Sequence, residues 1–136
     1  MRVFPLPESG DIVWCRFPHH GMGRPGPKPR PALAVDIGSI GSAPAVEVIY
    51  GTSQKLERLF AGEFAITPAD GAAFRESGLQ YPTKFDAARS VFLPYDGNWF
   101  SVPPHAPHGQ TPRLGVLHPS LMRRAQTAFD AAKRRR

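Results

Sequence analysis

Cysteine is nearly absent from this chain, since Cys15 is the single one among 136 residues. No intramolecular disulfide can form, and a zinc site built on several thiolates is excluded. Cys15 lies within an apolar stretch, residues 12–17, so we expect a small buried hydrophobic side chain rather than a nucleophile. A reducing compartment fits this composition, and the cytoplasm is the expected location.

Long apolar runs are also lacking. No segment approaches the ~18 residues of a membrane span, and Pro5 and Pro7 interrupt an N-terminal stretch too short for a secretory signal. The chain further contains no Walker loop, no Rossmann glycine motif and no Gly-x-Ser-x-Gly elbow. We therefore expect no membrane partner and no site of those nucleotide-binding or hydrolase types.

Proline and glycine are abundant, with 16 and 13 residues, and they fall mostly between short apolar runs. This distribution predicts a mainly β fold: one domain, residues 1–136, with a small twisted antiparallel sheet and a C-terminal helix. The expected strands are residues 12–17, 32–35, 46–50, 63–66, 83–93, 99–102 and 114–117, with a turn region at 38–44. One helix is expected at about residues 68–77, because Thr67 and Asp70 have the spacing of a capping box and Pro68 stands at the first helical position. A second is expected from His118-Pro119 onward.

Positive charge exceeds negative charge. Seventeen Lys and Arg face eleven Asp and Glu, which gives a formal net charge of +6. This balance favours an anionic partner. Charge alone would suit nucleic acid first and an anionic membrane surface second, and nucleic acid is the expected partner.

Arg30 stands between Pro29 and Pro31, directly before the apolar run of residues 32–35. The two prolines hold it in extended geometry at the mouth of a core strand. A guanidinium fixed there suits a phosphate group, and Arg24 and Lys28 in the preceding loop add charge of the same sign. The alternative is a solvated loop cation.

Two further polar groups lie near the ends of predicted strands. Thr52 and Ser53 follow a strand beside a glycine, where hydroxyls and backbone N–H groups can hold a phosphate oxygen or serve an ordinary turn. Asp86 lies between Lys84 and Arg89, so its charged form is favoured and it can accept a proton or form a surface ion pair.

Four histidines lie in two loops. His105-x-x-His108 has the spacing of a metal site, but no cysteine or carboxylate stands at ligand spacing, so no metal is expected. Proton transfer is a better-supported role for these histidines than metal binding, because imidazole gains and loses a proton near neutral pH. His19 and His20 precede Arg30 in the chain.

Four blocks of sequence, in order, resemble the MazF/PemK/Kid toxin family. The first is the opening, which consists of Gly10-Asp11-Ile12-Val13-Trp14, a glycine-containing loop and Arg30-Pro31-Ala32-Leu33-Ala34-Val35. The second and third are Gly51-Thr52-Ser53-Gln54 and Asp86-Ala87-Ala88-Arg89-Ser90-Val91. The fourth, Val116-Leu117-His118-Pro119 before an amphipathic helix, is similar to the family's ending.

The resemblance implies an SH3-like barrel of twisted antiparallel strands that forms a homodimer. It also implies the toxin of a type II toxin–antitoxin pair, which cleaves single-stranded RNA without a metal or other cofactor and is blocked by a cognate antitoxin. Arg30 matches the arginine at the scissile phosphate, Thr52 and Ser53 the hydroxyl pair, and Asp86 the acidic residue that acts as base in some members. His20, with His19 beside it, lies near a loop histidine. RNA-binding roles are expected for Arg24, Lys28, Gln54, Lys84 and Arg89.

The expected chemistry is attack of a 2′-hydroxyl on its own phosphorus, which needs alignment more than a metal. Asp86 is the first choice for base, and His19 or His20 for the acid. Two features depart from the family pattern: residues 22–28 lack the loop's acidic member, and residues 98–112 look like an insertion. Two alternatives stay open: a gyrase-binding inhibitor like CcdB, and a non-catalytic SH3-like nucleic-acid-binding protein.

Overall fold

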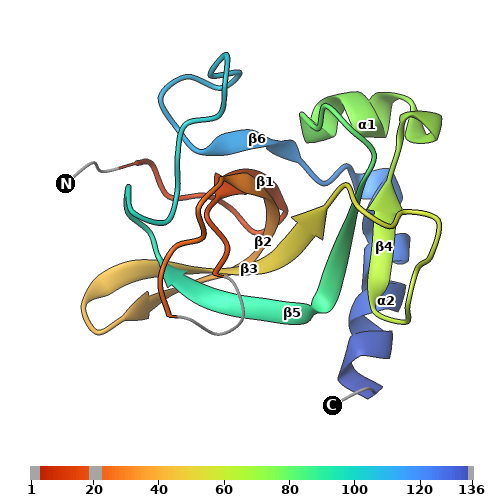
Figure 1. Ribbon diagram of the computed structural model, residues 1–136, viewed down its shortest axis with the longest axis horizontal. Coiled ribbons are helices and arrows are strands. Elements are labelled where there is room, and N and C mark those ends of the chain that lie inside the picture. The colour runs from red at the N-terminus through yellow and green to blue at the C-terminus, as the bar shows by residue number, and fades with distance from the viewer. Residues whose placement is uncertain (1–3, 19–22, 135–136) are drawn as a thin grey trace.

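Six antiparallel strands form one sheet in the order β4-β5-β3-β2-β1-β6 (Figure 1). The computed structural model describes residues 4–18 and 23–134. The strands are β1 (Asp11–Cys15), β2 (Arg30–Ile40), β3 (Ala43–Thr52), β4 (Glu63–Ile66), β5 (Thr83–Pro94) and β6 (Arg113–Val116). The prediction of a mainly β fold is confirmed.

The helices lie at one end of the sheet. The 3₁₀ turn η1 (Pro68–Asp70) leads into α1 (Ala72–Ser77), and η2 (Pro119–Leu121) leads into α2 (Met122–Arg134). Helix α2 packs against β4 and β5, whereas α1 packs against β6 (Figure 1). The predicted C-terminal helix is therefore confirmed. Within residues 4–18 and 23–134, no helix combines the length and the apolar character that crossing a membrane requires.

The sheet is curved but remains open. Its edge strands are β4 and β6, and no pairing joins them among the described strands. In Figure 1, α1 lies between these two edges, and its packing against β6 occupies the side on which β4 would have to approach. The strands and their antiparallel order agree with the expected architecture, but the described strands do not close into the barrel that the resemblance implies.

Two hydrophobic clusters cover the two faces of the sheet. Along β1, Ile12 and Trp14 belong to the cluster that α2 completes, while Val13 and Cys15 belong to the other. Alternate side chains of a strand point to opposite faces, so a strand with both sets buried lies in the centre of the fold. The Cys15 thiol is fully buried, which raises its pKa to about 12 and confirms its role as a packing residue.

Three predicted elements are corrected. The region 38–44 is strand rather than turn, because the β2–β3 ladder continues to Ile40 opposite Ala43 and leaves only residues 41–42 to reverse the chain. The helix expected at 68–77 is divided at Gly71, whose φ of 61° is incompatible with continuous helix. Residues 99–102 form only one isolated bridge, between Phe100 and Cys15.

Candidate functional site

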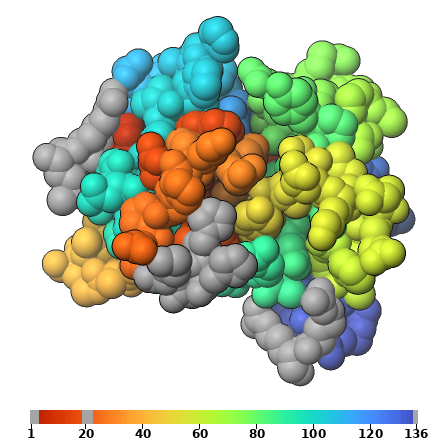
Figure 2. Space-filling model, viewed as in Figure 1, coloured from red at the N-terminus to blue at the C-terminus, as the bar shows by residue number. Residues whose placement is uncertain are grey.

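A pocket of about 360 Å³ opens where β1, β2 and β3 meet the segment that joins α1 to β5. In Figure 2 the segments near residue 30 (orange), residue 52 (yellow) and residue 80 (green) border a hollow in the surface. The pocket is lined by Trp14, Pro29, Arg30, Pro31, Gly51, Thr52, Ser53, Gly78, Leu79, Gln80, Tyr81, Thr83, Pro104, His105, Pro107 and Leu114. Three of the predicted catalytic residues, Arg30, Thr52 and Ser53, therefore line one cavity.

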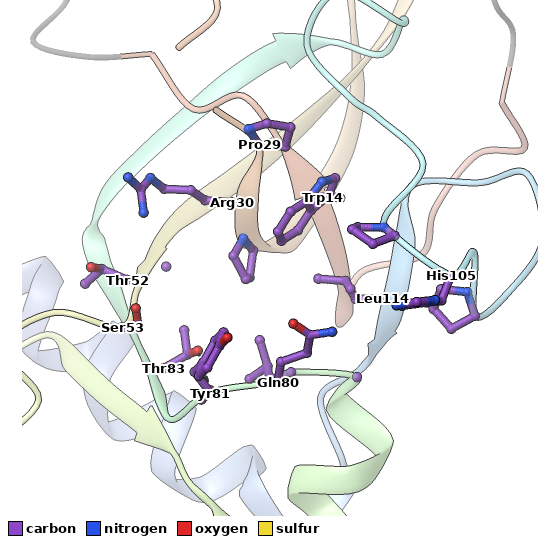
Figure 3. Close-up of a pocket in the computed structure, with 16 residues that line it drawn as sticks. Trp14, Pro29, Arg30, Thr52, Ser53, Gln80, Tyr81, Thr83, His105 and Leu114 are labelled. Atoms are coloured by element: carbon purple, nitrogen blue, oxygen red, sulfur yellow. Dashed lines mark hydrogen bonds between the residues drawn. The ribbon is translucent and has the colours of Figure 1, made fainter. Parts of the chain in front are cut away.

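Strand register explains why Arg30 and Thr52 meet. Ala32 of β2 pairs with Tyr50 of β3 in an antiparallel ladder. Continuing that register by two residues sets Arg30 across from Thr52, with both side chains on the same face of the sheet. Figure 3 shows Arg30 extending toward the side of the opening on which Thr52 and Ser53 lie.

Gly51 allows the two strands to approach closely at this point. A Cβ atom built there would lie 2.5 Å from the carbonyl oxygen of Pro31 and 2.8 Å from Cε1 of Phe85. No side chain fits in that space, so glycine is required for the close packing of β2 on β3 beside the pocket. The neighbouring Thr52 and Ser53 are consequently positioned at a crowded and well-packed strand end.

The Arg30 guanidinium has no partner within the part of the chain that the structure describes. It makes no hydrogen bond or ion pair there, and the residue is half-buried at the pocket's edge. On the other strand, Thr52 Oγ1 accepts a hydrogen bond of 3.1 Å from the backbone N–H of Gln54, while Ser53 is exposed. A free guanidinium and two hydroxyls on one wall form a set of donors suited to a phosphate group.

Asp86 lies beside the pocket rather than in its lining. It pairs with Tyr50, two residues along the strands from the Thr52–Lys84 pair. Because side chains alternate between the faces of a sheet, both pairs lie on the same face. The backbone N–H of Ala88 donates to its Oδ1 at 2.9 Å, and Oδ2 has no hydrogen-bond partner among the described residues, so it is available. Diagonal neighbours of this kind stand about 7–8 Å apart, so Asp86 lies one diagonal step from Thr52.

Lys84 does not reach the pocket. Its Nζ lies 3.2 Å from Oε1 of Glu63 and donates to the carbonyl of Arg58 at 3.1 Å, and both side chains of the ion pair are buried. An ammonium held in this way cannot reach a phosphate in the pocket without leaving Glu63 unpaired. Lys84 therefore lies outside the pocket lining, and its predicted RNA-binding role stays a prediction.

Arg89 remains at the surface next to the site. Its guanidinium carbon lies 4.4 Å from the centre of the Tyr50 ring and 5.8 Å from that of Phe17. Since Tyr50 stands on the same face as Thr52, the stacked cation is available for an anion that extends from the pocket. The predicted RNA-binding role of Arg89 stays a prediction.

The other predicted residues do not line the pocket. Arg24, Lys28 and Gln54 are exposed in loops outside it. His19 and His20 lie outside the described residues, so their predicted catalytic roles stay predictions.

The pocket also contains residues that the sequence reasoning left out of the site. Gln80, Tyr81 and Thr83 form the wall opposite Trp14, and His105 lies at the opposite end from Thr52 (Figure 3). The sequence offers His105 as a metal ligand or a proton-transfer group but does not place it in this pocket. Among residues 4–18 and 23–134, no three His, Cys, Asp or Glu side chains gather as a metal would require. The sequence signal for this wall is the pair Gln80-Tyr81 directly before Pro82, and a pair of this kind does not by itself indicate a site.

Comparison with solved structures shows that the fold is shared. An endoribonuclease from a mycobacterial species, in complex with its cognate antitoxin, aligns with a TM-score of 0.56 at 20% identity, covering 94% of this chain and 95% of that one. A second mycobacterial endoribonuclease aligns with a TM-score of 0.55 at 18% identity, covering 97% and 95%. No protein-family model and no curated protein matches the chain. At these identities the likeness concerns the fold.

Proposed function

We propose that this chain is the toxin of a type II toxin–antitoxin pair and cleaves single-stranded RNA. The observation that carries the proposal is the Arg30 guanidinium, unpaired among the described residues, which lies across from Thr52 and Ser53 in one pocket. Two endoribonucleases have the same fold along nearly their whole length, and one of them was solved with its cognate antitoxin. The resemblance of four sequence blocks to the MazF/PemK/Kid toxins agrees with both.

The proposed reaction is an internal transesterification. The 2′-oxygen attacks the adjacent phosphorus, a bond from that oxygen to phosphorus forms, and the bond from phosphorus to the 5′-oxygen breaks. The products are a 2′,3′-cyclic phosphate and a 5′-hydroxyl end. Because the nucleophile is already attached to the substrate, alignment supplies much of the rate and no metal is needed.

Each residue near the pocket has a proposed part in this scheme. Arg30 and the Thr52-Ser53 hydroxyls hold the phosphate and stabilise the charge that grows on its oxygens. Asp86, one diagonal step away, accepts the proton of the 2′-hydroxyl through its available Oδ2. A histidine protonates the departing 5′-oxygen: His19 and His20 stay the predicted donors, and His105 lies on the pocket rim.

The partners follow from the same proposal. The substrate is single-stranded RNA, whose phosphates match a chain with a net charge of +6. A cognate antitoxin binds the chain and blocks the pocket, the chain acts as a homodimer, and the reaction takes place in the cytoplasm.

Replacement of Arg30 tests the proposal. Purified wild-type protein should cut single-stranded RNA and leave 2′,3′-cyclic phosphate ends, whereas Arg30→Ala should lower the cleavage rate about 100-fold or more. Arg123→Ala is the matched control, because Arg123 is an exposed arginine on α2 outside the pocket. Rates come from gel analysis of an end-labelled RNA, and thermal melting verifies that both variants fold.

Two results would contradict the proposal. Cleavage by Arg30→Ala at the wild-type rate would remove the guanidinium from the reaction. Cleavage of an RNA that carries a 2′-deoxy sugar at the mapped cut would show that the 2′-hydroxyl is not the nucleophile.

A further inference from the structure

Tyr81 is unusually exposed for an aromatic side chain. Its exposed fraction is 66%, the highest among the large hydrophobic side chains at the surface of the described chain. It does not stand alone on the surface, because its ring borders the pocket that contains Arg30 (Figure 3). Exposed aromatic rings at the edge of a cavity mark sites where a partner supplies the missing contacts.

The segment that carries Tyr81 is anchored on both sides. Before it, Leu79 is buried and its N–H donates to Oγ of the fully buried Ser77 at 3.2 Å. After it, the hydroxyl of the buried Thr83 donates to the carbonyl of Tyr81 at 2.9 Å. Pro82 further restricts the backbone of the residue before it. The ring is therefore held outward by a fixed backbone, so its exposure does not result from a loose loop.

Trp14 faces this segment from the opposite side of the pocket. It belongs to β1, pairs with Pro31 and packs against the core cluster that contains Ile12 and Leu33. Figure 3 shows Trp14 and Tyr81 on opposite sides of the opening. Two aromatic side chains on facing walls, both supported from behind, can hold a flat ring between them.

Gln80 adds a group that can distinguish one base from another. Its side chain is exposed and lines the pocket, and within the described chain it makes no hydrogen bond. A glutamine amide offers both an N–H donor and a carbonyl acceptor. An unsatisfied amide beside an aromatic platform suits the hydrogen-bonding edge of an unpaired base.

We propose that Gln80 and Tyr81 form a nucleobase subsite, in which a base next to the scissile phosphate stacks on Tyr81, faces Trp14 and is read by the Gln80 amide. The inference deepens the proposed ribonuclease function and rests on it. Stacking is tolerant of base identity, so Tyr81 contributes affinity. Hydrogen bonds depend on the edge of the base, so Gln80 contributes preference.

Kinetics on short RNAs that contain the mapped cut test the subsite. Tyr81→Ala should raise KM about tenfold, with a smaller change in kcat, and Tyr81→Phe should restore KM because the ring is kept. Gln80→Ala should narrow the ratio of kcat/KM between preferred and disfavoured bases about fivefold. Phe60→Ala is the control, since Phe60 is an exposed aromatic (57%) outside the pocket.

Binding separates this inference from the function on which it rests. Wild type and variants are titrated with an uncleavable RNA that carries a 2′-deoxy sugar at the cut, with tryptophan fluorescence as the signal. Binding that weakens in Tyr81→Ala supports the subsite even where wild-type protein proves unable to cleave. Cleavage by wild type with KM and base preference unchanged in both variants overturns the subsite and leaves the ribonuclease intact. No binding and no cleavage by wild type overturns both.

Discussion

At the scale of single residues, two cations at the same end of the sheet have different roles. Arg30 stands across from Thr52 with its guanidinium unpaired in the described chain, while Lys84 pairs with Thr52 in the ladder but directs its ammonium to Glu63. Both residues carry one positive charge. The buried carboxylate decides the difference, because an ion pair removed from water is costly to break.

Asp86 can be assigned or excluded as the base by one substitution. Asp86→Asn keeps the shape of the side chain and an oxygen that can accept from the Ala88 N–H, but it removes the proton-accepting carboxylate. If Asp86 is the base, kcat should fall about 100-fold or more while the affinity for uncleavable RNA changes little. Single-turnover cleavage and a binding titration measure the two quantities.

Asp96→Asn is the matched control for that experiment, since Asp96 likewise accepts a hydrogen bond from a backbone N–H two residues later, at 2.9 Å. A wild-type kcat in Asp86→Asn would show that another group is the base, and His105 on the pocket rim is then the candidate.

At the scale of elements, one ion pair joins the segment before α1 to helix α2. Both terminal guanidinium nitrogens of Arg124 donate to the Asp70 carboxylate, at 3.0 and 3.1 Å, and Nη1 also donates to the carbonyl of Ala65 at 2.9 Å. Asp70 also accepts from the Thr67 N–H at 2.9 Å and so completes the predicted capping box. These contacts fix where η1 begins and thereby the path of the chain toward the pocket wall at residues 78–83.

The pH dependence of stability tests this link. The hydrogen bond from Arg124 holds the pKa of Asp70 below its ordinary value of 3.8. A lowered folded-state pKa means that the stabilisation is fully present above the unfolded value and is lost as pH falls through the folded value. Asp70→Asn should therefore lower the free energy of unfolding by about 1 kcal/mol at pH 7, and the difference should shrink below about pH 4.

Urea unfolding of both proteins between pH 7 and pH 2.5 measures that difference. Asp130→Asn is the control, because Asp130 is exposed on α2 and its carboxylate accepts a hydrogen bond from the nearby Gln126 side chain rather than from an arginine. A gap between wild type and Asp70→Asn that stays constant down to pH 2.5 would show that the ionised carboxylate is not its source.

At the scale of the whole molecule, three consecutive strands and two segments far from them in sequence build one pocket on a positively charged chain. The strand order brings β1, β2 and β3 together, and the α1–β5 segment and the loop before β6 complete the walls. The net charge of +6 favours association with a polyanion irrespective of its sequence. Affinity from charge and selectivity from the pocket are therefore separate properties of this fold.

The proposed reaction predicts that cleavage continues in a chelator. The attacking group belongs to the substrate and the phosphate charge is met by Arg30 and hydroxyls, so the rate in EDTA should stay within about twofold of the untreated rate. A metal-dependent nuclease in the same buffer provides the positive control. If EDTA stops cleavage and an added divalent metal restores it, the proposed scheme is wrong.

Local signals in the sequence determined much of this protein. The proline and glycine spacing predicted short strands, the Thr67–Asp70 capping box was readable, and strand β4 was predicted with its observed bounds. Such signals act through the backbone of a few neighbouring residues, so they can be read without the rest of the chain. The placement of Arg30 at the start of a core strand belongs to the same class.

The tertiary structure alone decided which side chains share the pocket. Strand register set Arg30 across from Thr52, burial paired Lys84 with Glu63, and the anchored segment after α1 brought Gln80 and Tyr81 to face Trp14. Contacts of this kind join residues tens of positions apart, and they depend on packing that no short stretch of sequence specifies.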